Sequence, residues 1–192
     1  MDKNSLIERW KRSGIDLHRL DRNMLAALGL DNKTVNHMVE VGLPSSASPW
    51  LEFDVLGDDI ERFGRPVKEM MEGLPDEVGQ YVSIGFNGSG DHLTVDCENG
   101  GVIWVLDHDD DFKPMYVNAD LPTLNLSLLA YQDFVEKVIA KAGDMAYLDG
   151  IYDLEAVEEL QQILSVHDSK AVQSGTFWSI EIQTLLANRT AN

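Results

Sequence analysis

The sequence predicts an α+β fold, with a largely antiparallel central sheet and N-terminal and C-terminal helices packed around it. Near both ends of the chain, apolar residues recur at helical spacing, whereas residues 45–118 show the alternation and the turn residues of strands. Helices and strands therefore come in blocks, which is typical of α+β folds rather than of βαβ units. Because the expected connections between strands are short, the strands should pair antiparallel.

A chain of 192 residues predicts a single domain, 1–192, with residues 1–24 as an N-terminal helical extension. The chain is 44% hydrophobic and 25% charged, which excludes a disordered or fibrous protein. At this length a chain buries about 70% of its unfolded surface, so a core needs neither disulfides nor metals.

Two helices are expected before the strands. The first covers 5–12, where Ser5 and Glu8 have the spacing of a capping box. The second covers 31–40, with Asp31 as its N-cap.

The clearest strand signal is a β-hairpin formed by residues 92–97 and 102–107. Between them, Asn99-Gly100 is the dipeptide that suits a tight type I′ turn. Further strands are expected near 50–54, 80–85 and 114–118. In the mixed region 57–78, Val67, Met70 and Met71 could share one helical turn.

The last third of the chain predicts three helices, over 121–142, 153–165 and 176–187. The first of these is unusually rich in apolar residues at helical spacing, which predicts a helix that is central to the core.

Charge is distributed unevenly. The chain has 33 acidic and 15 basic residues, a net charge of −18. Residues 1–40 carry a small positive excess, and the acidic excess lies in residues 41–192. Such a field disfavours direct nucleic-acid binding and binding to anionic membranes, and it favours a basic protein partner. The sequence contains no secretory signal or membrane span, so a cytoplasmic location is expected.

The glycine-rich segment 85–91 does not predict a phosphate-binding loop. Its spacing is G-x-x-G-x-G, and a strand rather than a helix follows it. We expect a connection between strands in which glycines adopt positive φ and Asp91 hydrogen-bonds the turn backbone.

An acidic turn follows the hairpin, and it contains Asp107, Asp109, Asp110 and Asp111. Three of these residues have the 1-3-5 spacing of a calcium loop, but Phe112 and Asn118 replace the required Gly and Glu, so an EF-hand is excluded. Three interpretations stay open: a solvated turn, a site for a divalent cation, and an acidic contact patch for a basic protein.

No catalytic constellation is evident. The single cysteine, Cys97, lies in the hairpin and is expected to be half-buried, and no G-x-S-x-G or H-x-x-x-H motif occurs. We therefore predict no catalytic residues, no cofactor and no metal ligands. Among the four tryptophans, three are expected in the core, whereas Trp50 follows a loop-like Ser-Ser-Ala-Ser-Pro stretch and could be an exposed anchor.

Several short motifs then occur in a fixed order. They are Val41-Gly42-Leu43-Pro44, Ile84-Gly85 with Gly88 and Gly90-Asp91, Gly101-Val102-Ile103-Trp104-Val105-Leu106-Asp107-His108-Asp109, and Gly175-Thr176-Phe177-Trp178. Over roughly residues 25–190 this order resembles the SUKH superfamily, and within it the bacterial immunity proteins of polymorphic toxin systems. The residues matched as structural signatures are Gly42, Leu43, Pro44, Gly85, Gly88, Gly90, Asp91, Trp104 and Trp178.

The resemblance implies a non-enzymatic protein that binds and neutralises a cognate toxin domain, often a nuclease. The expected contact residues are Trp50, Asp107, Asp109, Asp110 and Asp111. The alternative is a regulatory or scaffold protein of the same fold without a toxin partner.

Overall fold

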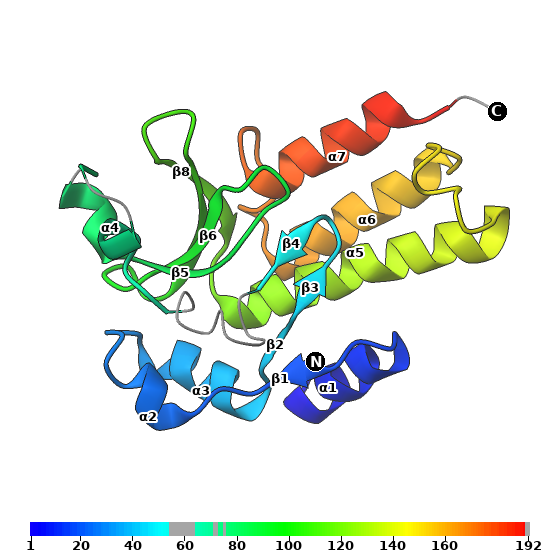
Figure 1. Cartoon of the computed structure of the whole chain (residues 1–192). Coiled ribbons are helices and arrows are strands. Elements are labelled where there is room, and N and C mark those ends of the chain that lie inside the picture. Colours follow the sequence, from blue (N-terminus) through cyan, green and yellow to red (C-terminus); the bar gives the residue numbers. More distant parts are fainter. Residues whose placement is uncertain (54–63, 71–72, 75, 191–192) are drawn as a thin grey trace.

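A computed structural model describes residues 1–53, 64–70, 73–74 and 76–190. Its centre is a six-stranded sheet in the order β3-β4-β5-β6-β7-β8 (Figure 1). The strands are β3 Ser46–Ala47, β4 Leu51–Glu52, β5 Tyr81–Phe86, β6 His92–Asp96, β7 Val102–Asp107 and β8 Lys113–Asn118. A second, two-stranded sheet pairs β1 Leu17–His18 with β2 Leu43–Pro44. All of these pairs are antiparallel, which confirms the sheet type expected from the sequence.

Helices precede and follow the strand block in the sequence, and two short ones, α4 Val67–Met70 and η2 Asp76–Gln80, lie within it between β4 and β5. The others are α1 Lys3–Arg12, α2 Arg22–Leu25, α3 Asn32–Glu40, α5 Leu121–Ala142, α6 Leu154–His167 and α7 Phe177–Asn188. In Figure 1 the long helix α5 runs beside α6, and the N-terminal helices α1 to α3 lie below the sheet. The α+β fold class is confirmed.

The N-terminal helices begin at aspartates. The Asp2 carboxylate accepts hydrogen bonds from the backbone N–H groups of Asn4 and Ser5, so α1 starts earlier than predicted and Ser5 is not its cap. Asp2 takes this role because its carboxylate can accept two N–H groups at once. Asp31 caps α3 as predicted.

The core is built around α5, and two buried tryptophans donate to buried asparagines. Trp10 of α1 donates to Asn125 Oδ1 over 2.6 Å, and Trp178 of α7 donates to Asn118 Oδ1 over 2.9 Å. Asn125 in turn bonds His37 of α3 over 2.8 Å. Both indoles are fully buried, so their N–H groups need these partners.

The hairpin of β6 and β7 is confirmed, but the tight type I′ turn is wrong. Residues 97–101 join the two strands, and positive φ occurs at Gly100 and Gly101 but not at Asn99. The Asp96 carboxylate instead accepts the backbone N–H groups of Glu98 and Asn99, which organises a longer turn.

The segment between β4 and β5 contains the predicted helical turn, α4. Val67 is fully buried there, and Met71 lies outside the described residues. Val67 packs with Leu106 and Phe112 in a small second core on the face of the sheet that α4 covers.

The antiparallel order places successive turns at opposite ends of the sheet. The turns after β3, β5 and β7 lie at one end, which we call the Trp50 end (Figure 1). The turn after β6 lies at the other end, which we call the Asp96 end, close to α2 and α3. The fold therefore brings together three turns at the Trp50 end. The β3–β4 turn is about forty residues before the β5–β6 turn, which is about twenty residues before the β7–β8 turn.

Candidate functional site

Trp50 projects from the β3–β4 turn and is 67% exposed, which confirms the exposure predicted for it. Its φ of 53° lies in the left-handed region, which costs a residue with a Cβ about 1 kcal/mol. Gly88 of the β5–β6 turn lies against it: a Cβ at Gly88 would be 3.1 Å from Trp50 Cβ. The glycine therefore allows the two turns to approach.

The acidic turn between β7 and β8 is held by its one large apolar residue. Phe112 is buried in the second core, and its N–H donates to the Asp107 carbonyl over 2.8 Å. Both Asp111 and Phe112 have positive φ, at 51° and 58°. With Phe112 directed inward, the residues Asp109, Asp110 and Asp111 are exposed.

Asp91 joins the two neighbouring turns. Its Oδ1 accepts the His108 backbone N–H over 3.1 Å and His108 Nδ1 over 2.6 Å, while Asn87 donates to its Oδ2 over 2.8 Å. Burial opposes ionisation of Asp91, but these hydrogen bonds outweigh it and hold the pKa of the carboxyl below its ordinary value. The β5–β6 and β7–β8 turns are thereby held as one unit.

The expected role of Asp91 in its own turn is wrong. The residue that accepts the backbone N–H groups of that turn is Asn87, whose Oδ1 bonds the N–H groups of Ser89 and Asp91. Asn87 lies at the first position of the turn, where an amide oxygen can reach both donors, whereas Asp91 points to the next hairpin.

Two basic side chains, His108 and Lys113, shape the electrostatics of the acidic turn. The hydrogen bond to Asp91, with a further contribution from Asp109, raises the pKa of His108 above its ordinary value. Lys113 Nζ lies 2.9 Å from Asp110 Oδ2. Asp109 Oδ1 lies 3.5 Å from His108 Nε2, but its side chain is 89% exposed, and Asp111 is exposed as well.

Close backbone approach explains two glycines of the matched motifs. A Cβ at Gly42, where φ is 93°, would lie 2.5 Å from the His18 carbonyl oxygen, and one at Gly85 would lie 2.1 Å from that of Glu52. Gly42 precedes Leu43 in β2, and Gly85 lies in β5 beside β4. Gly90 has a φ of 87° and open space around it, so its conformation alone favours glycine.

The remaining signature residues belong to strands and to the core. Leu43 and Pro44 form β2 and are buried. Trp104 of β7 is partly buried and meets Tyr116 edge-on at 5.4 Å. Trp178 is fully buried, so Trp50 differs from it and from Trp10 in facing solvent.

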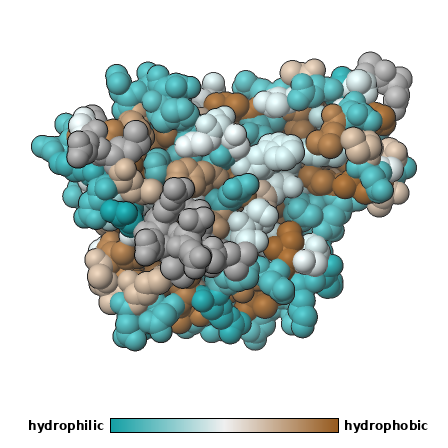
Figure 2. All heavy atoms as spheres, in the orientation of Figure 1, coloured by the Kyte–Doolittle hydropathy of each residue, from teal (hydrophilic) through white to brown (hydrophobic). Residues whose placement is uncertain are grey.

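A groove beside Trp50 adds residues that we did not predict. It has a volume of about 500 Å³ and lies between the β3–β4 turn, α5 and the loop that follows α5. Figure 2 shows hydrophobic atoms gathered to the right of the centre of this face, toward the loop after α5. That loop exposes Met145 (58%) and Leu148 (59%). The sequence did offer a signal for this exposed loop, because large apolar residues occur in a connection between Gly143 and Gly150.

The described residues do not contain a group of three or more His, Cys, Asp or Glu side chains arranged to hold a metal ion. Cys97 is half-buried, and burial, assisted by Asp96, raises the pKa of its thiol to about 11. A thiol that stays protonated at neutral pH is a poor nucleophile. Among the described helices, none is both long and apolar enough to span a bilayer.

Comparison with known proteins identifies the family. Residues 5–184 match the family described as SUKH-4 immunity protein. No curated protein and no solved structure matches the chain. The match covers nearly the whole chain and confirms the SUKH resemblance drawn from the glycine, aspartate and tryptophan motifs. The chain belongs to the SUKH-4 immunity protein family.

Proposed function

We propose that this chain neutralises a cognate bacterial toxin domain by binding it through the Trp50 end of the sheet. The observation that carries the proposal is the juxtaposition of an exposed tryptophan and an exposed acidic turn at that end. Trp50 touches the β5–β6 turn, and Asp91 of that turn holds the acidic turn through His108. An aromatic anchor beside charged groups is a common composition of a tight protein interface.

The charge of the chain supports a basic partner. With a net charge of −18 and solvent-facing carboxylates at Asp109 and Asp111, the Trp50 end attracts a positively charged surface and accelerates encounter. Nucleases carry basic clefts for phosphate groups, so a nuclease toxin domain is the partner that we propose. An acidic protein bound over such a cleft would exclude the nucleic acid.

The proposed role is stoichiometric and non-enzymatic. Family membership supports it, and in this role the protein acts in the cytoplasm on incoming toxin. Protection then depends on occupancy of the toxin, so it should scale with the amount of immunity protein and be independent of any cofactor.

The experiment is co-expression with the toxin domain encoded beside this chain, with host survival and co-purification as readouts. We expect survival and a stable complex whose association slows at high salt. The control is an unrelated acidic protein expressed at the same level. Death of the host, with both proteins folded and no complex formed, would overturn the proposed function for that partner.

A further inference from the structure

We infer that the groove beside Trp50 receives an apolar side chain of the partner that is flanked by lysine or arginine residues. The inference rests on the proposed function and assigns to it a second contact surface, adjacent to the acidic turn. It commits to a protein segment of stated chemistry: a hydrophobic anchor between basic neighbours.

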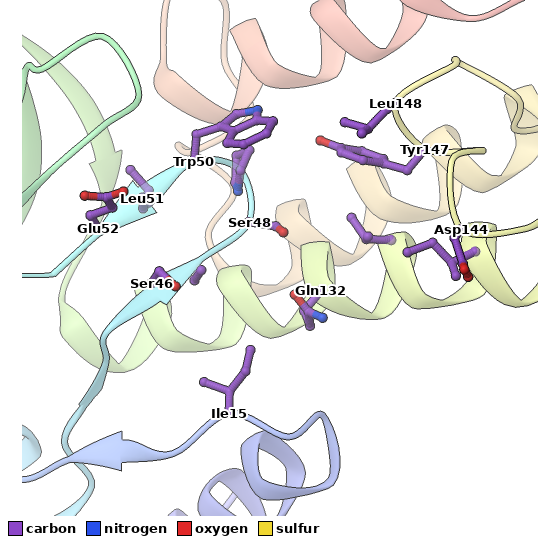
Figure 3. A pocket seen from close by; sticks show the side chains of 14 residues that line it. Ile15, Ser46, Ser48, Trp50, Leu51, Glu52, Gln132, Asp144, Tyr147 and Leu148 are labelled. Carbon is purple, nitrogen blue, oxygen red and sulfur yellow. The ribbon is translucent and has the colours of Figure 1, made fainter.

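The groove is lined mainly by apolar side chains. On the α5 side it is lined by Val135 and Ile139, together with the polar Gln132. Trp50 stands on one side, and Tyr147 and Leu148 of the loop after α5 stand on the other (Figure 3). A volume of about 500 Å³ is within the range of pockets that enclose small ligands, so one large side chain fits.

Acidic side chains at the edges of the groove favour basic residues on either side of the partner's apolar side chain. Glu52 and Asp144 lie at opposite edges of the groove and are both exposed (Figure 3). Among the described residues that line the groove, none is lysine or arginine. An apolar side chain with basic neighbours therefore finds a carboxylate near each edge, whereas one with acidic neighbours meets repulsion.

The backbone that carries Trp50 is ordered before binding. Its backbone adopts φ 53°, Pro49 beside it is buried, and the indole lies across the groove from Leu148 (Figure 3). Because this turn is already ordered, its backbone needs little further ordering on association. Exposure of two large apolar side chains to water is itself unfavourable, and a partner that covers them releases that cost.

The direct test uses three capped peptides that require no toxin: Lys-Lys-Phe-Lys-Lys, Lys-Lys-Ser-Lys-Lys and Glu-Glu-Phe-Glu-Glu. The readout is the NMR signal of each tryptophan indole N–H, and the variant Trp50→Ala assigns that of Trp50. Trp10 and Trp178 are fully buried and serve as internal references. We expect the first peptide alone to shift the Trp50 signal in a saturable way, with the shift reduced by Leu148→Ser. No shift, or an equal shift with either of the other peptides, would overturn the inference.

A second copy of the chain is the competing occupant. If the Trp50 signal shifts with protein concentration in the absence of peptide, and the mass in solution rises to that of a dimer, the groove is a self-association surface. That outcome would overturn the assignment to a basic partner.

The same variants separate this inference from the proposed function. In the toxin complex, Trp50→Ala should weaken binding by about tenfold or more, as expected for a central aromatic anchor. Val166→Ser is the matched control, because Val166 is 78% exposed on α6 and does not line the groove. A complex that Trp50→Ala does not weaken would overturn the groove and the anchor role of Trp50, and it would leave standing only the neutralisation of a toxin domain by binding. Peptide binding without any toxin complex would contradict the proposed function and support the groove.

Discussion

The two ends of the central sheet differ in how much their turn side chains are buried and bonded within the chain. At the Asp96 end, the turn after β6 packs against α3 at Gly101, where a Cβ would lie 2.5 Å from Asp31 Oδ2 and Thr34 Oγ1. The Asp96 carboxylate is 1% exposed and fully occupied by donors of the same chain. At the Trp50 end, by contrast, an indole and several carboxylates face solvent.

The buried Asp96 and the exposed aspartates of the acidic turn therefore contribute differently. A buried carboxylate surrounded by internal donors stabilises the fold, because its removal would leave those donors without a partner. An exposed carboxylate contributes little to folding and remains available to another molecule. We therefore expect the buried Asp96 to matter more for stability than the exposed carboxylates at the Trp50 end, for which we propose a role in recognition, and four experiments examine this contrast.

The largest expected effect is that of Asp96→Ala. The carboxylate accepts hydrogen bonds from Glu98 N, Asn99 N, Asn99 Nδ2 and Gln80 Nε2. Losing a buried charged acceptor with several donors should lower the free energy of unfolding by about 4 kcal/mol, measured by urea denaturation. Asp109→Ala at the Trp50 end is the control and should change it by less than about 0.5 kcal/mol. Equal losses in the two variants would contradict the contrast between the ends.

The second effect concerns pH and two histidines whose pKa values shift in opposite directions. Burial lowers the pKa of His37, on the helix that covers the Asp96 end, to about 4. Between that value and the ordinary value of 6.5 the unfolded chain binds the proton and the folded chain does not, so stability falls as pH is lowered through this window. The loss should approach about 3 kcal/mol, from the linkage of 1.36 kcal/mol per pKa unit.

Urea unfolding of the wild type and of His37→Asn across this window provides the measurement, and the variant should show the weaker pH dependence. His108 at the Trp50 end should give the opposite pH dependence of stability. Because its pKa is raised in the folded chain, its stabilising contribution is present at low pH and is lost as pH rises through that raised pKa. In His108→Asn the loss of stability toward alkaline pH should be smaller than in the wild type, and an unchanged profile would contradict the Asp91–His108 link.

A smaller effect is expected from a matched pair of glycines. Gly101 and Gly90 have similar positive φ values, 81° and 87°, but only Gly101 is close to other atoms. Alanine at either position costs about 1 kcal/mol for the left-handed conformation, and at Gly101 the contact with α3 should raise the total to about 2–3 kcal/mol. Thermal unfolding of Gly101→Ala and Gly90→Ala would test the difference. Identical losses would show that the Asp96 end is not tightly packed against α3.

The smallest effect is on association rate. The double variant Asp109→Asn/Asp111→Asn should slow association with the toxin domain by about fivefold at low salt, with little change in dissociation rate. Glu155→Gln/Glu158→Gln on α6 is the matched control, since both glutamates are exposed and the net charge changes equally. Stopped-flow measurements on both variants distinguish a local contact from the effect of total charge. Equal slowing would assign the effect to net charge alone.

Much of the fold could be predicted from the sequence because the signals are local. Helical periodicity places α5, α6 and α7 within a few residues of their observed ends, and Asp31 is visible as the cap of α3. The errors are also local. The start of α1 and the β6–β7 turn depend on which of several nearby carboxylates and glycines takes a given backbone role, and short-range propensity does not rank them.

Individual residues of the candidate site could be predicted from the sequence, but their spatial arrangement could not. An exposed Trp50 and an acidic turn were predictable, since each follows from its immediate sequence context. That they lie at one end of the sheet, linked through Gly88 and Asp91, depends on the order β3-β4-β5-β6-β7-β8, which a single sequence does not specify.

By itself, then, the sequence determined the fold class, the helix positions, the acidic character and the family resemblance, because each depends on residue type and on spacing along the chain. Only the tertiary structure decided that the loop after α5 faces Trp50 and that Leu148 and Asp144 complete a groove with it. These residues are almost one hundred positions from Trp50 in the chain. The physical reason is that long-range packing of α5 against the sheet, driven by burial of its apolar side chains, sets the positions of both groove walls.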